Sequence, residues 1–163
     1  MTDVLDLIPE KDDNKLLVLF HNAQDILSGR RKAPKEKVRK AQIVINAIEK
    51  EWQLRVQLAA SGDYKGTLPD IGMLKTFGYT VGNNGEPKWH RKDLLRIVFE
   101  SELPLVSSPA YTLEWGKPKT RKRFNKLQRT LWGLRAGKSY AENAVLDYTD
   151  DLEFIDDFKT AIV

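Results

Sequence analysis

The sequence predicts a mainly α-helical protein of about six or seven helices, with a long N-terminal helical hairpin and one small β-hairpin. Two observations carry this prediction. Apolar residues recur every three or four positions through most of the chain, which is the period of an amphipathic helix. Most glycines and prolines lie between these periodic stretches or at their ends, where turns and helix caps need them.

The composition of the chain excludes several classes of function. The chain has 163 residues, a formal net charge of +4 and no cysteine. Disulfides, thiolate zinc sites and a thiol nucleophile are therefore excluded. The longest apolar run, 16–20, is too short to span a bilayer, and the acidic N-terminus lacks the basic segment of a secretory signal. We predict a cytoplasmic protein without a membrane role.

Two long helices are predicted in the first sixty residues. The first covers about 13–28, where an aspartate can cap its start and Gly29 ends it. The second follows Pro34 and continues to about residue 60. Its apolar residues form a heptad-like stripe, which is typical of a helix packed nearly antiparallel on a neighbour. The stripe consists of Val38, Ala41, Ile45, Ile48, Trp52, Val56 and Ala59.

The stretch after this hairpin has the composition of a loop. Residues 61–69 contain serine, aspartate, proline and two glycines, which favour turns. We therefore predict an N-terminal helical hairpin over 1–60, a loop over 61–69 and a compact helical unit over 70–163, joined in one continuous domain.

The middle of the chain is predicted to be less regular. Asp70 can cap a short helix that ends at Gly78. Residues 79–90 predict the small β-hairpin, because β-favouring residues flank a Gly-Asn-Asn-Gly turn. A helix over about 91–101 follows, with its leucines and Phe99 directed inward.

Three further helices complete the predicted fold. Residues 108–115 begin with Ser-Pro, an N-cap followed by proline at the first helical position. Thr120 caps a basic helix that ends at Gly137, and a last helix covers about 140–161. The basic helix is predicted to turn Phe124 and the leucines at 127, 131 and 134 inward.

The last two predicted helices carry opposite charges. Residues 117–138 hold nine Lys or Arg and no acid, whereas residues 139–163 hold seven acids and one Lys. One interpretation is a helix pair whose flanks attract each other, with solvated outer faces. The other is a surface that binds phosphates.

The phosphate interpretation predicts a non-enzymatic protein that binds DNA or RNA, or acts as an accessory to such binding. The basic helix over 117–135 and the basic cluster over 30–40 would contact phosphates. Trp89, Trp115 and Trp132 could stack on bases, although large aromatics more often belong to a core. Trp115, next to the basic run, or Trp89 is the predicted stacking residue. The predicted nucleic-acid contacts are Arg30, Arg31, Lys32, Lys119, Arg121, Lys122, Arg123, Lys126, Arg129 and Trp115.

A protein–protein adaptor is the alternative. The heptad-like stripe of the second helix, or the two oppositely charged helices, would then bind another protein or a second copy of the chain.

No catalytic, cofactor or metal site is predicted. His21 and His90 are too few for a histidine-rich metal site, and local packing roles are expected for both. The glycines within 78–85 lack the Gly-Lys-Ser/Thr or GxGxxG pattern of a phosphate loop, so they predict turns. The paired acids at 150–151 and 156–157 are expected to lie on a solvated helix.

A pattern of glycines, prolines and aromatic residues extends through the central stretch. It consists of Leu74, Gly78-Tyr79, Val81-Gly82, Gly85, Arg91, Leu94-Leu95, Leu103-Pro104, Ser108-Pro109, Glu114-Trp115-Gly116, Pro118, Thr120, Arg123 and Lys126. On these residues the stretch resembles a domain of uncharacterised bacterial proteins, in which it often lies near the C-terminus. The resemblance covers roughly 70–155 and implies a domain family without a function.

Overall fold

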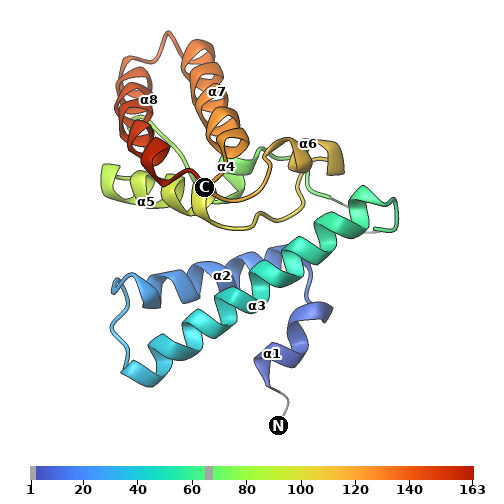
Figure 1. Cartoon of the computed structure of the whole chain (residues 1–163). Helices are drawn as coiled ribbons and strands as arrows, with labels where there is room; N and C mark the ends of the chain where they lie inside the picture. Colours follow the sequence, from blue (N-terminus) through green and yellow to red (C-terminus); the bar gives the residue numbers. More distant parts are fainter. Residues whose placement is uncertain (1–2, 65–67) are drawn as a thin grey trace. The chain divides into compact units, whose positions relative to one another are not determined.

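The computed structural model describes residues 3–64 and 68–163. These residues form eight α-helices and two 3₁₀ helices, with no strand among them (Figure 1). The mainly helical class predicted from the sequence is therefore confirmed. The chain divides into two compact units, which are described separately. Of the described residues, the first unit comprises 3–64 together with Leu103–Leu105, and the second comprises the others.

The first unit is built on a helical hairpin. A short helix α1 (Val4–Leu7) and a 3₁₀ turn (Ile8–Glu10) precede α2 (Asp13–Leu27) and α3 (Lys35–Ala60). The long helices α2 and α3 lie side by side (Figure 1). Asp12 begins α2 because its carboxylate accepts a hydrogen bond from the backbone N–H of Lys15, as an N-cap does.

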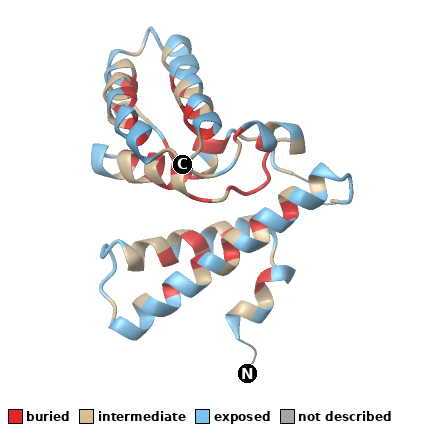
Figure 2. Cartoon of the chain, in the orientation of Figure 1, coloured by how far each residue is buried: buried red, intermediate tan, exposed pale blue. Residues whose placement is uncertain are grey.

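The heptad-like stripe of α3 is used inside this unit. Four of its seven residues are buried, and Figure 2 shows buried positions recurring along α3. The rings of Phe20 and Trp52, both fully buried, lie 4.9 Å apart between centroids. Burying side chains of this size is worth about 1.5–3 kcal/mol each, so this stripe holds the hairpin together. The four residues are Ala41, Ile45, Ile48 and Trp52.

Arg55 connects the start of α2 to α3. Its guanidinium donates hydrogen bonds to Glu51 (2.9 Å), to the Asp13 carboxylate (2.7 Å) and to the carbonyl of Lys11 (2.7 Å). Tyr64 donates to the second oxygen of Asp13 at 3.3 Å. A buried guanidinium is tolerated here because carboxylates and a carbonyl replace its water.

The second unit contains the remaining helices. Figure 2 shows that their buried residues face one another, with exposed residues on the outer sides of α7 and α8. Phe99 of α5 stacks on Phe158 of the terminal 3₁₀ helix, with centroids 4.8 Å apart. The helices are α4 (Met73–Thr76), α5 (Lys88–Glu100), α6 (Pro109–Glu114), α7 (Arg121–Gly137), α8 (Glu142–Ile155) and the 3₁₀ helix Asp156–Ala161.

The β-hairpin predicted over 79–90 is wrong. The backbone N–H of Gly85 donates to the carbonyl of Gly82 at 3.0 Å, and the N–H of Glu86 donates to Thr80 at 3.1 Å. These two bonds close a loop, but no ladder of strand pairs extends from it. Residues that sequence propensity assigns to the return strand belong instead to α5, which begins at Lys88.

Proline explains this difference. Pro87 has no N–H to donate to a strand pair, and its φ of −63° suits a residue just before a helix. A two-stranded hairpin alone is marginal in water, so extending α5 toward the N-terminus is the more stable outcome.

None of the helices in 3–64 and 68–163 combines the length and apolar character that crossing a bilayer requires.

Candidate nucleic-acid interface

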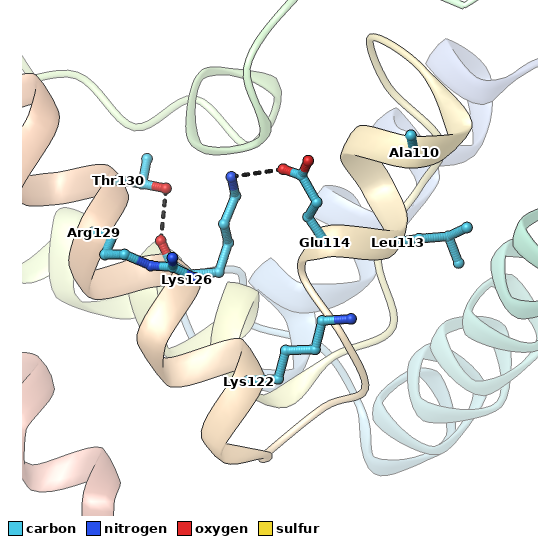
Figure 3. Close-up of a pocket in the computed structure, with 7 residues that line it drawn as sticks. All are labelled: Ala110, Leu113, Glu114, Lys122, Lys126, Arg129 and Thr130. Atoms are coloured by element: carbon cyan, nitrogen blue, oxygen red, sulfur yellow. Dashed lines mark hydrogen bonds and ion pairs between the residues drawn. The ribbon is translucent and has the colours of Figure 1, made fainter.

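A groove lies between α6 and α7 in the second unit (Figure 3). Its volume is about 760 Å³. The three cations in its lining, Lys122, Lys126 and Arg129, are spaced by four and three residues, which places them on one face of α7. The lining consists of Ala110, Leu113, Glu114, Lys122, Lys126, Arg129 and Thr130.

Lys126 is the most constrained of these cations. Its ammonium forms an ion pair with Glu114 at 3.0 Å, drawn as a dashed line in Figure 3. The same ammonium lies 5.3 Å from the ring centroid of Tyr111 and 5.9 Å from that of Trp115, within the range of cation–π attraction. Lys126 therefore joins α7 to α6, and part of its charge is compensated.

Lys122 and Arg129 extend the positive charge beyond that pair. Both are exposed. The stem of Lys122 lies against Gly116, so closely that a Cβ there would meet Lys122 carbons at 3.0 Å. Gly116 has φ +69°, which also favours glycine. The guanidinium of Arg129 donates to the carbonyl of Asn125 at 3.3 Å on the exposed side of α7.

The carboxylates of α8 pair with α5. Lys88 lies 3.2 Å from Asp150, and Arg91 lies 3.5 Å from Asp147. Arg91 also pairs with Asp151 at 2.9 Å. These contacts draw three acids of the last helix toward α5. Asp151 is fully buried, so the expectation that the acids at 150–151 lie on a solvated face is wrong for this residue.

Arg123 belongs to the interior and is not an exposed phosphate contact. Only 1% of its surface is exposed. Its guanidinium donates to two carbonyls at the C-terminal end of α5, Val98 and Ser101, and to two that follow α6, Trp115 and Gly116. The C-terminal end of a helix leaves backbone carbonyls without partners and carries partial negative charge. The guanidinium of Arg123 supplies hydrogen-bond donors and a positive charge at this end of both α5 and α6. The sequence-based assignment of Arg123 to a binding surface is corrected accordingly.

Trp115 is also not the exposed stacking residue that the sequence predicts. Its ring is fully buried, with Tyr111 6.3 Å away in an edge contact. A ring that has no exposed surface cannot stack on a base in this conformation. Trp115 is a core residue beneath the groove, where it supports Lys126.

The remaining predicted contacts are exposed but belong to different units. Lys119 and Arg121 precede or begin α7 and are exposed, as are Lys122 and Arg129. Arg30, Arg31 and Lys32 are exposed in the segment between α2 and α3, where Arg30 pairs with Asp25 at 3.0 Å. The two basic clusters therefore lie in separate units of the structure.

Two exposed tryptophans differ from the general expectation that large aromatics are core. Trp89 is 57% exposed and Trp132 is 47% exposed. Leu134, predicted to point inward from α7, is 37% exposed. The inward positions Phe124, Leu127 and Leu131 are buried as predicted. Trp132 directly follows the buried Leu131, so it lies about 100° further around the helix axis. This offset from the apolar stripe is the sequence feature that indicates an exposed tryptophan.

The histidines take local roles. His90 forms a 2.7 Å hydrogen bond with Glu86, and its ring lies 5.3 Å from that of Trp89. His21 is half-buried and has an edge contact with Phe20. Within 3–64 and 68–163, no group of three His, Asp or Glu side chains forms an arrangement that would hold a metal ion.

The chain matches no known protein family, no curated protein and no solved structure. The resemblance to a bacterial domain over 70–155 therefore stays a prediction.

Proposed function

We propose that this protein binds the phosphate backbone of a nucleic acid through exposed cations of the second unit, without catalysing a reaction. The contacts would come from Lys119, Arg121, Lys122 and Arg129, which lie before and along α7. Lys126 would contribute from within the α6–α7 groove, and Arg123 and Trp115 would only support the surface from below.

One observation carries the proposal. The acids of α8 that form ion pairs across the unit do so with Lys88 and Arg91 of α5. The α7 residue Arg135 contacts α8 through the hydroxyl of Thr149, at 3.4 Å, which is an uncharged partner. The segment 117–138 contains no acid of its own. This pattern favours a positive surface along α7 over a mutually neutralised helix pair.

The spacing of the cations suits a charged chain. Lys122 and Arg129 are seven residues apart on α7, which corresponds to about 10 Å along the helix axis. Between them the groove offers a volume of about 760 Å³ beside Lys126. Binding phosphates there would release counterions, so affinity is expected to fall steeply as salt rises.

The test is a salt titration of labelled DNA and RNA oligonucleotides, single- and double-stranded, with the full-length chain. The variant Lys122→Gln/Arg129→Gln should weaken binding and reduce the slope of log K against log salt by roughly 1.4–1.8. The matched control, Lys15→Gln/Lys50→Gln, removes the same charge from exposed positions of α2 and α3 and should change the slope far less. Absence of binding at low salt, or equal losses in the two variants, would contradict the proposal.

The cluster over 30–40 is tested separately. Arg31→Gln/Lys32→Gln removes two exposed charges from the first unit. A loss of slope comparable to that of the α7 variant would include this cluster in the interface. An unchanged slope would restrict the interface to the second unit.

A further inference from the structure

We infer that the nucleic acid bound by this surface is single-stranded, and that Trp132 is the residue on which a base stacks. This inference rests on the proposed function and specifies its ligand. The base contact is assigned to Trp132, because Trp115 is buried.

Trp132 lies on the same face of α7 as the exposed cations. Lys122, Asn125, Arg129 and Trp132 are all exposed and follow one another in steps of three, four and three residues. That spacing keeps them on one side of an α-helix. From Lys122 to Trp132 the distance along the axis is about 15 Å. The ring therefore continues a row of positive charge.

The ring of Trp132 is available to a ligand. It is 47% exposed. Within the described part of the chain it has no hydrogen-bonded or aromatic partner. The next residue, Gly133, has no heavy atom within 4 Å of the position that a Cβ would occupy. The helix surface next to Trp132 therefore has open space on the side of Gly133.

An exposed tryptophan alone is an ordinary surface feature. The position of Trp132 next to Arg129, on a face that carries cations, is what indicates a binding role. Proteins that bind single strands combine a positively charged track for phosphates with aromatic rings on which bases stack. In a duplex the bases are already stacked on each other, so the ring has no base face to contact. The combination of cations and Trp132 therefore favours a single strand.

The experiment compares three ligands of equal length and charge per strand. These are a single-stranded oligothymidylate, an abasic strand with the same phosphates but no bases, and a duplex. Trp132→Ala should weaken binding to the oligothymidylate by about fivefold to a hundredfold and leave the abasic strand unaffected. Trp132→Phe, which keeps a ring, should restore most of the affinity.

Trp89→Ala is the matched control, because Trp89 is exposed on α5 and lies outside the basic segment. It should change none of the three affinities. Circular dichroism should give the same helix content for all variants, since the rings at 89 and 132 are exposed.

The outcomes separate the two proposals. If Trp132→Ala leaves the oligothymidylate affinity unchanged while Lys122→Gln/Arg129→Gln lowers it, single-strand stacking is wrong and phosphate binding stands. If the wild-type chain binds none of the ligands at low salt, both are wrong. If sedimentation shows that Trp132→Ala dissociates a dimer, a second copy covers the ring, and the stacking assignment is overturned.

Discussion

Arg91 donates two hydrogen bonds to the carboxylate of Asp151, sixty residues further along the chain. The distances are 2.9 Å from Nε to Oδ2 and 3.3 Å from Nη2 to Oδ1. The hydroxyl of Tyr79 donates to Oδ2 at 2.6 Å. Asp151 is fully buried, so these donors replace the water that its charge has lost. The contact joins α5 to α8, and two further acids of α8, Asp147 and Asp150, also pair with cations of α5.

Removing this carboxylate should destabilise the protein strongly. Asp151→Ala leaves the buried guanidinium of Arg91 without its principal partner, and such a loss typically costs about 3–5 kcal/mol. Asp150→Ala is the control, because that carboxylate is 33% exposed, pairs with Lys88 at 3.2 Å and reaches Arg91 only at 3.9 Å. Its loss should cost less than about 1 kcal/mol. Urea unfolding followed by circular dichroism measures both. Equal free energies of unfolding for the two variants would contradict the role assigned to the buried pair.

Tyr79 should make stability depend on pH in alkaline solution. Burial, followed by the charge of Asp151, raises the pKa of Tyr79 far above its usual value. In the unfolded chain the phenol ionises near pH 10, whereas in the folded chain it keeps its proton. Above about pH 10 the folded state therefore binds more protons, and this group lowers the free energy of unfolding by about 1.4 kcal/mol per pH unit.

Tyr79→Phe removes that contribution. The variant should lose about 1.5–3 kcal/mol at neutral pH, because Asp151 loses a hydrogen bond, but its stability should fall less steeply above pH 10. Urea midpoints measured from neutral pH into the alkaline range test this expectation. Parallel curves for wild type and variant would show that Tyr79 ionises equally in both states.

Arg123 should be a structural residue that lysine cannot replace. Lysine carries a single ammonium group and cannot reach carbonyls at two helix ends in the way that the planar guanidinium does. Arg123→Lys should therefore cost about 2–4 kcal/mol, because buried carbonyls of Val98, Ser101, Trp115 or Gly116 lose their donor. Arg121→Lys, at an exposed position two residues earlier, should stay within about 0.5 kcal/mol. Thermal unfolding distinguishes the two, and similar Tm values would refute the buried role.

Two glycines should respond to alanine in opposite directions. A Cβ on Gly85 would lie 2.4 Å from the backbone carbon of Val81, so Gly85→Ala forces the loop before α5 to shift. We expect a loss of about 1–3 kcal/mol or more. Gly133 lies inside α7 with open space around it, and Gly133→Ala should stabilise by up to about 1 kcal/mol. Calorimetric Tm values of opposite sign relative to wild type are the expected result.

The sequence identified most helices because their signals are local. The predicted helix over 13–28 is observed as Asp13–Leu27, and the predicted cap Thr120 accepts a hydrogen bond from the N–H of Arg123. Caps, proline positions and apolar periodicity act within a few residues, so they can be read without a structure. The predicted hairpin failed because propensity for a strand at 88–90 competed with a helix start at Pro87.

Local signals did not determine which charged residues are buried. In the sequence Arg121, Lys122 and Arg123 form one basic run, yet Arg121 and Lys122 are exposed whereas Arg123 is enclosed. Its carbonyl partners belong to residues up to 25 positions away, and only the packing of α5, α6 and α7 brings them together. The same holds for Asp151, whose partners Arg91 and Tyr79 lie 60 and 72 residues earlier.

The sequence by itself determined the helical class, the approximate limits of the long helices and the concentration of positive charge in 117–138. The tertiary structure decided which of those charges are exposed, which acids pair with α5, and that Trp132 is open to solvent while Trp115 is buried. The physical reason is one of range. Helix formation and capping depend on neighbours within about four residues, whereas the burial of a charge depends on donors and acceptors supplied by distant segments.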